Sequence, residues 1–324
     1  MLRLRPCVVL RSKLRAVDEF ALIQRYFVRK NEARGVITGI GDDGAVLRPE
    51  AGRELISVID TLVAGVHFPV AIAAADLGYR VVAVNLSDIA AMGGRPLWMT
   101  LALTMPSANE DWVAEFASGL HQAAAEHDVA LVGGDTTKGD AVVASVQITG
   151  DVAAGAAIHR SGARIGDTIF VTGSVGDAAA GLELLLADKP DDFLTSRFLR
   201  PAARVSFGQA LAGVASAAID ISDGLLGDLH KLLTASGVAA EIDIERLPIS
   251  DALSSHFDAT AQRRFALLGG DDYELCFTAS TDTLPAAHDL RVTAIGTITD
   301  GDKLICRDSS GIVEFDHSGY RHFQ

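Results

Sequence analysis

Seven aspartates stand in five short apolar or glycine-rich stretches of this chain: GIGDDGAV at 39–46, VIDTLV at 58–63, NLSDIAAM at 85–92, VGGDTT at 132–137 and IDISDG at 219–224. A carboxylate buried among Ile, Val, Leu and Ala is costly unless a positive charge compensates it. Lys and Arg are nearly absent from these stretches, so we expect that charge to come from outside the chain. Oxygen-only ligands favour Mg²⁺ or Mn²⁺. The pattern therefore predicts that carboxylates distant in sequence converge on several divalent cations at a phosphate-handling site.

The first stretch also satisfies the GxGxxG pattern of dinucleotide-binding folds, from Gly39 to Gly44. Two carboxylates inside such a loop would repel a pyrophosphate, and the following AVLRPEAG has no helical periodicity, so we reject that interpretation. A glycine turn in which Asp42 and Asp43 hydrogen-bond their own backbone is the structural alternative. The other acids favour a metal role for Asp43.

The next two acids adjoin regular elements. Asp60 ends a strand-like segment, ELISVID. Asp88 shares one face of an otherwise apolar helical pattern with Asn85 and Met92. Because the surrounding residues are apolar, a buried metal ligand is a better interpretation of Asp88 than a solvated side chain.

Two later motifs follow apolar strands. In VGGDTTKG, the glycines let the backbone approach a phosphate closely, and Asp135 is expected at the strand end after Gly134. In IDISDGLL, Asp220 and Ser222 lie on the same side of an extended segment, and Asp223 is expected to open the next helix. N-capping alone is the alternative role for Asp223.

Further candidates could contact substrate. Arg160 and Arg164, in RSGARIGD, could grip a nucleotide phosphate, or either could be an ordinary surface charge. GGDDYEL supplies three acids, Asp271, Asp272 and Glu274, of which we expect one to face substrate. A lone histidine is more often structural, but His67 follows the Asp60 strand closely and is therefore a candidate.

The elements that must position these residues alternate along the chain. We expect strands at 54–60, 98–105, 129–133 and 141–152, helices at 74–92 and 109–127, and a loop at GGDTTKG. An N-terminal helix is expected from Asp18, with Phe20, Ile23 and Phe27 on one stripe. Residues 153–167 read as a linker into a second unit, where a helix begins at a glycine turn in TGSVGDAAAGL and another ends at Gly237. This alternation predicts an α/β or α+β fold.

Composition narrows the class of protein. Lys and Arg number 28 against 42 Asp and Glu, a formal charge of −14, which argues against nonspecific binding to nucleic acid or anionic membrane. The three cysteines, Cys7, Cys276 and Cys306, lack metal-ligand spacing, so ordinary thiols in a reducing cytoplasm are expected. No apolar run approaches the ~18 residues of a membrane span. We interpret residues 1–17 as a disordered or appended tail.

Nine motifs, in order, resemble the thiamine-monophosphate kinase family of the aminoimidazole ribonucleotide synthetase-like superfamily: GIGDDGAV, DTLVAGVHF, NLSDIAAMGG, GGDTTKG, RSGARIGD, TGSVGDAAAGL, AIDISDGL, GGDDYELCF and GYRHF. The resemblance implies a two-domain architecture. It comprises an N-terminal ATP- and Mg-binding domain with a mixed sheet (18–152), which also dimerises, and a C-terminal α/β domain (153–324).

The resemblance also implies roles for individual residues. The implied activity is ATP-dependent phosphorylation of thiamine monophosphate to thiamine diphosphate by a homodimer, with several Mg²⁺ ions and with K⁺ as a further candidate ion. Implied Mg²⁺ ligands are Asp43, Asp60, Asp88, Asp135, Asp220 and Asp223; implied ATP contacts are Gly134, Asp135, Arg160 and Ser222; implied thiamine-side contacts are His67, Asp271 and Tyr320. Two departures from the family pattern stand out. Val58 and Ile59 replace hydroxyl residues, and Asp271 replaces a glutamate.

The mechanism expected from these residues needs no general base, because the acceptor phosphate is already anionic at neutral pH. The carboxylate-held Mg²⁺ ions and Arg160 would stabilise direct in-line transfer, and Tyr320 or Phe323 could stack on the thiazolium or pyrimidine. Two alternatives stay open. One is another ATP-using enzyme of the same superfamily. The other is a nonenzymatic protein that binds nucleotide or thiamine phosphate.

Overall fold

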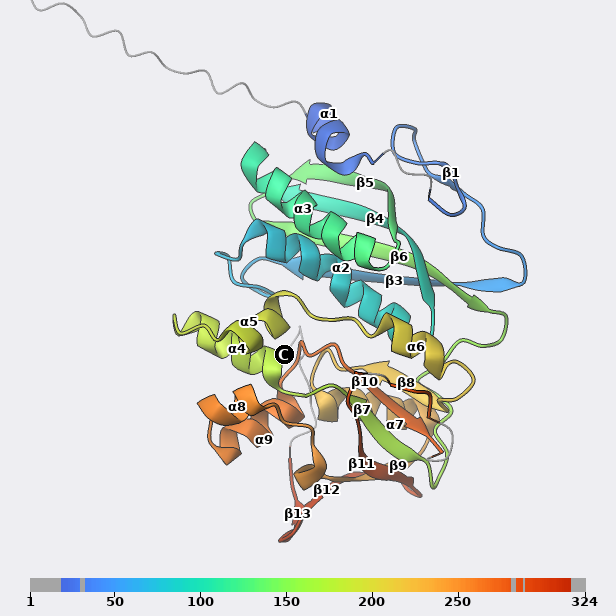
Figure 1. Cartoon of the computed structure of the whole chain (residues 1–324), viewed down its shortest axis with the longest axis vertical. Helices are drawn as coiled ribbons and strands as arrows, with labels where there is room; N and C mark the ends of the chain where they lie inside the picture. The colour runs from blue at the N-terminus through green and yellow to red at the C-terminus, as the bar shows by residue number, and fades with distance from the viewer. Residues whose placement is uncertain (1–18, 30–32, 281–283, 288, 316–324) are drawn as a thin grey trace, which may run out of the picture.

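The computed structural model describes residues 19–29, 33–280, 284–287 and 289–315 of the chain (Figure 1). The N-terminal part runs through α1 (Glu19–Leu22), η1 (Ile23–Phe27), β1 (Val36–Thr38), β2 (Val46–Leu47), β3 (Arg53–Val63), α2 (Ala74–Ala91), β4 (Arg95–Met105), α3 (Glu110–Glu126), β5 (Ala130–Lys138) and β6 (Val143–Ala153). The tail expected at 1–17 lies outside the described residues.

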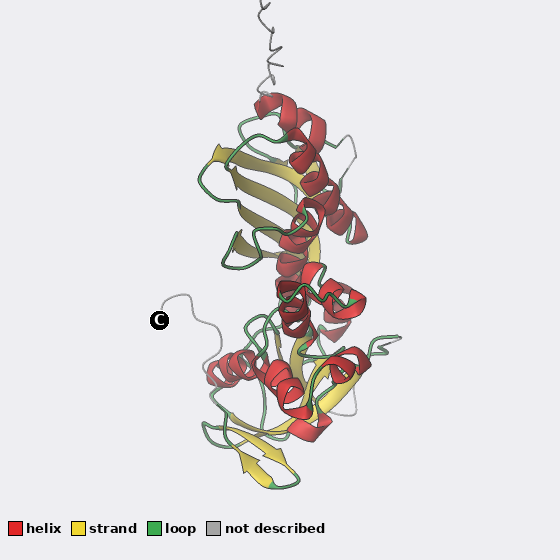
Figure 2. Ribbon diagram, turned by 90° about the vertical axis from the view of Figure 1, so that its left-hand side faces the viewer, coloured by secondary structure: helices red, strands yellow, loops and turns green. Residues whose placement is uncertain are grey.

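The N-terminal sheet is mixed, as expected, with strand order β3-β6-β4-β5. β6 pairs antiparallel with β3 and β4, whereas β4 and β5 run parallel. Helices α2 and α3 cover one face of the sheet, and Figure 2 shows its other face without a described helix over it. The exposed residues on β3 include Leu55 and Ile59, which are 52% and 66% exposed.

Two glycines let α2 and α3 pack closely. A Cβ on Gly78 of α2 would lie 2.0 Å from the carbonyl oxygen of Phe116, and one on Gly119 of α3 would lie 1.8 Å from that of Ala75. Real Cβ atoms cannot approach so closely, so the missing side chains set the distance between the helices. Asn109 caps α3 by accepting the backbone N–H groups of residues 111 and 112.

The C-terminal part contains β7 (Thr168–Thr172), α4 (Asp177–Leu186), α5 (Asp192–Leu199), α6 (Val205–Leu211), β8 (Ala217–Asp220), α7 (Leu225–Ser236), β9 (Ala239–Asp243), η2 (Ile244–Arg246), α8 (Asp251–His256), α9 (Ala259–Leu268), β10 (Leu275–Ala279), β11 (Val292–Thr299), β12 (Leu304–Asp308) and β13 (Gly311–Val313). Its strands form one sheet in the order β13-β12-β9-β11-β7-β10-β8. Only the β9–β12 pair is parallel among the pairings described.

One hydrophobic core joins the two parts. It contains Val81 of α2 and Ile148 of β6 together with Phe170, Phe207 and Phe277 from β7, α6 and β10. α2 contacts β3 on one side and α6, β8 and β10 on the other. The helix that carries Asp88 is therefore packed between the N-terminal sheet and the C-terminal part (Figures 1 and 2).

Most expected elements are confirmed, and two expectations are wrong. α7 ends at Gly237, whose φ of +67° suits a residue without a side chain. The segment GGDTTKG is not a loop, because its residues through Lys138 continue β5 in register with β4. Asp135 therefore stands inside a strand and not at its end.

The expected N-terminal stripe is also wrong. Phe20 is 72% exposed, and the buried residues of this segment are Leu22 and Phe27. Residues Ile23–Phe27 form a π-helix, whose wider turn moves side chains off the face that an α-helix would give them. Within the described residues, no helix is both long and apolar enough to cross a membrane.

Candidate active site

A cavity of about 1200 Å³ lies between the N-terminal sheet, α2 and the C-terminal part. Eight predicted site residues line it: Asp60, His67, Asp88, Arg160, Asp220, Ser222, Asp223 and Asp271. They come from β3, α2, the end of β8, the turn before α7 and three loops. The fold thus brings together residues separated by more than two hundred positions in sequence.

Three carboxylates form the centre of this cavity. Asp88 of α2 lies beside Asp60 of β3, close enough for the Asp60 charge to act on it. Burial, followed by the neighbouring Asp60 charge, raises the pKa of Asp88 to about 7. Asp220 is 4% exposed. Its pKa is raised well above the usual value, first by burial and then by Asp88 and Asp228. Burial and mutual repulsion therefore make it unfavourable for all of these carboxylates to be ionised at once.

The turn between β8 and α7 is held by an acid that the sequence analysis missed. Asp228 Oδ2 accepts the backbone N–H groups of Ser222 and Asp223 at 2.9 and 2.8 Å. Lys231 Nζ donates to Asp228 Oδ1 at 2.8 Å and to Asp223 Oδ2 at 2.5 Å. Asp223 is not the helix N-cap, since Gly224 occupies that position without a side chain. For Asp223, the compensating charge comes from inside the chain, contrary to the expectation.

A second loop is tied to this turn. The backbone N–H of Asp271 donates to Ser222 O, and that of Tyr273 donates to Ile221 O, both at 2.9 Å. Asp271 and Tyr273 have φ values of +70° and +51°, which are uncommon for residues with side chains. Arg80 of α2 donates to the Asp271 carboxylate. Of the acids in GGDDYEL, only Asp271 lines the cavity, whereas Asp272 and Glu274 are fully buried.

His67 and Arg160 complete the polar lining. The backbone N–H of Val63 donates to His67 Nδ1 at 3.0 Å, so this nitrogen carries no proton. Arg160 is exposed, and its charge acts to lower the pKa of Asp88 against the effect of burial. Arg164 is not among the residues that line the cavity.

Asp43, Gly134 and Asp135 do not line this cavity. Asp42 Oδ1 accepts the backbone N–H of Asp43 at 2.9 Å, which is the turn geometry of the alternative interpretation. Asp135 pairs in register with Ala102; both are exposed, whereas Leu101 and Leu103 are buried, so Asp135 faces the uncovered side of the sheet.

The structure gives Gly134 a packing role, and it leaves one predicted residue undescribed. A Cβ on Gly134 would lie 2.1 Å from the carbonyl oxygen of Leu101 in β4, so only glycine fits there. Tyr320, predicted to contact substrate, lies outside the described residues, as does Phe323.

The donor set in the cavity suits Mg²⁺ in its chemistry. Its buried charged groups are carboxylates, and Mg²⁺ prefers oxygen ligands. Among the described residues, no group of three or more His, Cys, Asp or Glu side chains could by itself hold a metal ion. Protein sites for Mg²⁺ commonly use one or two carboxylates and complete the shell with phosphate oxygens and water. Metal ligation by the predicted acids stays a prediction.

The cavity lining also has an apolar part. It is formed by Val66, Phe68 and Pro69 from the β3–α2 loop and by Leu182, Leu186 and Leu268 from α4 and α9. Val66 and Leu186 are 56% and 67% exposed. Large apolar side chains exposed together in a cavity are typical of ligand sites. The lining therefore combines groups suited to phosphate and cations with side chains suited to an organic ring.

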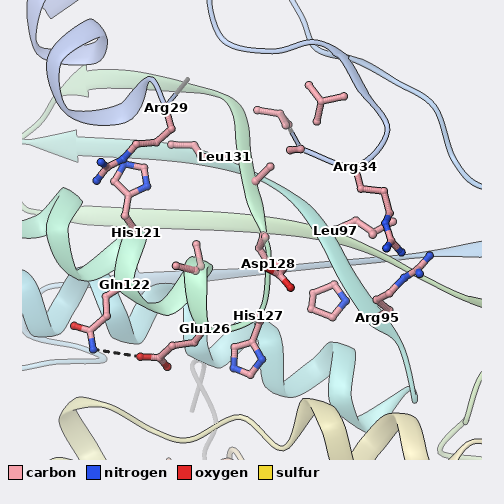
Figure 3. Close-up of a pocket in the computed structure, with 18 of the residues that line it drawn as sticks. Arg29, Arg34, Arg95, Leu97, His121, Gln122, Glu126, His127, Asp128 and Leu131 are labelled. Atoms are coloured by element: carbon pink, nitrogen blue, oxygen red, sulfur yellow. Dashed lines mark hydrogen bonds between the residues drawn. The ribbon is translucent and has the colours of Figure 1, made fainter. Parts of the chain in front are cut away.

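A second cavity, of about 1160 Å³, is lined by residues of α3, β4, β5 and α6 and of the segment that follows η1. Figure 3 shows Arg29, Arg34, Arg95 and His121 on its walls, with Glu126 hydrogen-bonded to Gln122. Arg95 already pairs with Asp151 and Glu50. No predicted site residue lines this cavity.

Several residues that line the first cavity or support its lining were missed by sequence reasoning. Asp228 and Lys231 looked like ordinary residues of an amphipathic helix, and Tyr273 looked like part of a strand. Arg80 gave a signal that could have been used, because it interrupts the apolar helical pattern LGYRVVAVNL. A basic residue in a helix that is buried on most sides needs an acidic partner.

Two family models match the chain. The model described as AIR synthase related protein, N-terminal domain, matches residues 41–152, and the corresponding C-terminal domain model matches residues 164–309. The chain is 45% identical over 323 residues to thiamine-monophosphate kinase of Salmonella typhimurium, covering 95% of this chain and 99% of that protein.

Solved structures give the same relationship. The crystal structure of thiamine-monophosphate kinase from Stenotrophomonas maltophilia is 45% identical, with a TM-score of 0.84 over 91% of this chain and 98% of that one. The structure of AaThiL complexed with AMPPCP and TMP is 34% identical, with a TM-score of 0.77 over 88% of this chain and 92% of that one.

Proposed function

The chain belongs to the thiamine-monophosphate kinases of the AIR synthase related family, and from that membership we propose that it phosphorylates thiamine monophosphate with ATP to give thiamine diphosphate. The observation that carries this proposal is a cavity whose lining combines two kinds of group. Carboxylates and basic residues make up one part of the lining, and exposed apolar side chains make up the other. Thiamine monophosphate has the same division, with a phosphate at one end and aromatic rings at the other.

The carboxylates of the lining address the repulsion between two anionic phosphates. Asp60, Asp88, Asp220 and Asp223 would hold Mg²⁺ there, and when bound the ions neutralise phosphate charge and stabilise the transition state. The raised pKa of Asp88 and Asp220 supports this role, because their site disfavours negative charge that is not compensated. Ser222 lies beside these acids in the cavity, in position to contact the nucleotide.

The transfer itself needs little from the chain beyond positioning. The acceptor phosphate carries an anionic oxygen at neutral pH, so no side chain has to remove a proton. Arg160 is an exposed guanidinium on the cavity wall and would contact the transferred phosphoryl group. We propose direct in-line transfer between the two phosphates without a phosphoenzyme.

The thiamine end would lie toward His67 and Asp271. Both line the cavity, as do the apolar residues Val66 and Leu186. Nδ1 of His67 accepts the backbone N–H of Val63, which holds the imidazole ring in the cavity lining. Asp271 presents a carboxylate to a substrate whose thiazolium is cationic. Tyr320 stays a predicted contact of this end.

Assembly would complete the predicted ligand set. The uncovered face of the N-terminal sheet carries Asp135 together with the exposed Leu55 and Ile59. A homodimer formed through this face would bury these apolar side chains. It would also bring Asp43 and Asp135 together at the interface between the subunits. We also propose that the boundary between the two domains lies near residue 152. The same proposal includes a cytoplasmic location for the protein and K⁺ as an additional ion.

The replacement of hydroxyl residues by Val58 and Ile59 has different consequences at the two positions. Val58 is half-buried and lies two residues from Asp60, on the same side of β3. Ile59 is 66% exposed on the opposite side. A hydroxyl lost at position 58 would therefore remove a neighbour of Asp60, whereas one lost at 59 would not.

The test is a direct assay of product. Purified protein is incubated with Mg-ATP and either thiamine monophosphate or thiamine, and thiamine diphosphate is separated and quantified. We expect product from thiamine monophosphate only. Product from thiamine alone would indicate a pyrophosphokinase instead. Binding of both ligands without product would favour the nonenzymatic alternative.

A further inference from the structure

Arg80 is a charged side chain that is fully buried in the described part of the chain. It lies on α2 and reaches into the C-terminal part, where its guanidinium donates to Asp271 and to the carbonyl oxygen of Phe198. The central carbon of its guanidinium, Cζ, lies 4.3 Å from the ring centroid of Phe198 and 5.7 Å from that of Tyr273. Arg80 does not line the cavity, so its effect on a ligand must pass through these neighbours.

The group that Arg80 holds is a loop with an unusual backbone. Asp271 and Tyr273 both adopt positive φ, a conformation that side chains disfavour and that persists only where the surroundings impose it. Tyr273 Oη donates to Asp271 Oδ1 at 3.2 Å, so the same carboxylate oxygen receives both Tyr273 and Arg80. A buried guanidinium needs an anionic partner. The position of Arg80 therefore determines where Asp271 stands.

The same helix face makes a second attachment seven residues later. Ser87 Oγ donates to Asp220 Oδ2 at 2.8 Å. Residues separated by seven positions lie on nearly the same face of an α-helix. α2 thus holds one carboxylate from each of two C-terminal segments, Asp271 through Arg80 and Asp220 through Ser87, and it contributes Asp88 to the same cavity.

We propose that Arg80 is a positioning residue that fixes the Asp271 carboxylate in the cavity lining, where it holds the thiamine end of the substrate. This inference rests on the proposed function and deepens it, because it assigns to a residue outside the cavity a role in substrate affinity. The role is selective. Arg80 hydrogen-bonds the Asp271 side chain, whereas Ser222, a proposed nucleotide contact, meets the same loop through its backbone carbonyl oxygen and not through Arg80.

The experiment compares two ligands on the full-length protein. Calorimetry measures the Kd of thiamine monophosphate and, separately, of Mg-AMPPCP for the wild type, Arg80→Met and Arg80→Lys. For Arg80→Met we expect at least a tenfold increase in the Kd of thiamine monophosphate and less than a twofold change for Mg-AMPPCP. Arg80→Lys keeps the charge but cannot reach both Asp271 and the Phe198 carbonyl, so we expect a smaller increase of about threefold or more.

The control is Arg53→Met. Arg53 lies on β3, seven residues before Asp60, and it forms an ion pair with another buried carboxylate, that of Asp151, which the substitution removes. It should leave both Kd values within twofold of the wild type. An unchanged Kd for thiamine monophosphate in Arg80→Met, or an equal loss of affinity for both ligands, would overturn the proposal. If Arg80→Met does not fold, Arg80→Lys decides by the same comparison.

A coupled variant tests whether Arg80 acts through Asp271. In an Asp271→Asn background, adding Arg80→Met should weaken binding of thiamine monophosphate by less than a further twofold, whereas fully additive losses would contradict the proposed route. The wild type separates this inference from the function itself. If the wild type does not bind thiamine monophosphate, the proposed function fails. If it binds and the Arg80 variants bind equally well, only the role of Arg80 fails.

Discussion

At the scale of single residues, the cavity is defined by negative charge in places where negative charge is unfavourable. Burial and the neighbouring Asp60 charge raise the pKa of Asp88, and Asp220 is almost completely buried in the same cavity. Asp223 differs from these three because Lys231 already neutralises it. Under the proposed function, Asp60, Asp88 and Asp220 would be compensated by an external cation, whereas Asp223 would exchange its lysine partner for one.

Replacing Asp88 by asparagine tests the first group. The amide keeps the size of the side chain but cannot supply the negative charge that attracts Mg²⁺, so we expect kcat to fall by at least about a hundredfold. Circular dichroism and Tm should stay close to the wild type. Asp76→Asn, in the first turn of the same helix, is the matched control and should keep kcat within about twofold. A fully active Asp88→Asn enzyme would remove this residue from the metal site.

A second residue-level prediction concerns stability and pH. Burial raises the pKa of Asp272 to about 8, so the folded protein keeps a proton that the unfolded chain loses near its ordinary value of 3.8. Its contribution to stability is therefore complete below about pH 4 and is lost as the pH rises through about 8. In that window the free energy of unfolding should fall by up to ~1.4 kcal/mol per pH unit from this group.

Urea denaturation at pH 5, 6, 7 and 8 measures this dependence in the wild type and in Asp272→Asn. The variant should show a flatter curve at lower overall stability, because an amide nitrogen cannot accept the backbone N–H groups that Asp272 accepts from residues 176 and 178. The exposed Asp302→Asn serves as control and should leave the curve unchanged. Parallel curves for wild type and Asp272→Asn would show that Asp272 is ionised throughout.

At the scale of elements, α2 is the structural centre of the site. It contacts the N-terminal sheet on one side and α6, β8 and β10 on the other. Its position therefore determines where Asp88, Arg80 and Ser87 stand. The close contact between α2 and α3 through Gly78 and Gly119 sets that position from the third side.

Gly119→Ala tests this contact. The new Cβ would overlap the carbonyl oxygen of Ala75, so the helices must separate, and we expect a loss of ~1–3 kcal/mol in the free energy of unfolding. Chemical denaturation measures the loss. Ser118→Ala, at the adjacent exposed position, should change stability by no more than ~0.5 kcal/mol. Equal stability of Gly119→Ala and the wild type would mean that the helices tolerate a wider spacing.

At the scale of the whole molecule, the two predicted acids outside the cavity point to assembly. Asp135 stands on a sheet face that no described helix covers, beside exposed apolar side chains such as Leu55 and Ile59. If this face is the dimer interface, the wild type should have about twice the chain mass of 34.0 kDa by light scattering.

The double variant Leu55→Lys and Ile59→Lys should weaken that interface by placing charge on it, and we expect it to be monomeric and at least about tenfold less active. Phe193→Lys changes another exposed apolar residue, on α5, and should keep both the dimer and the activity. A double variant that stays dimeric, or a monomer with full activity, would exclude this face as a functional interface.

The sequence alone determined the local elements, the acidic character of the site and the family. The long amphipathic or apolar patterns of α2, α3 and β3 are local properties, as is the glycine that ends α7, so they could be read along the chain. The family motifs likewise identify residues by their neighbours in sequence.

Only the tertiary structure decided which of these residues meet. It placed Asp60, Asp88 and Asp220 together and left Asp43 and Asp135 elsewhere, although all five have similar local sequences. It also showed that GGDTTKG is a strand, because pairing with β4 overrides the turn preference of its glycines. The roles of Arg80 and Lys231 became clear only from their partners, which are distant in sequence or lie across a helix turn. Burial and charge pairing arise from long-range packing, and local sequence does not encode the distances on which both depend.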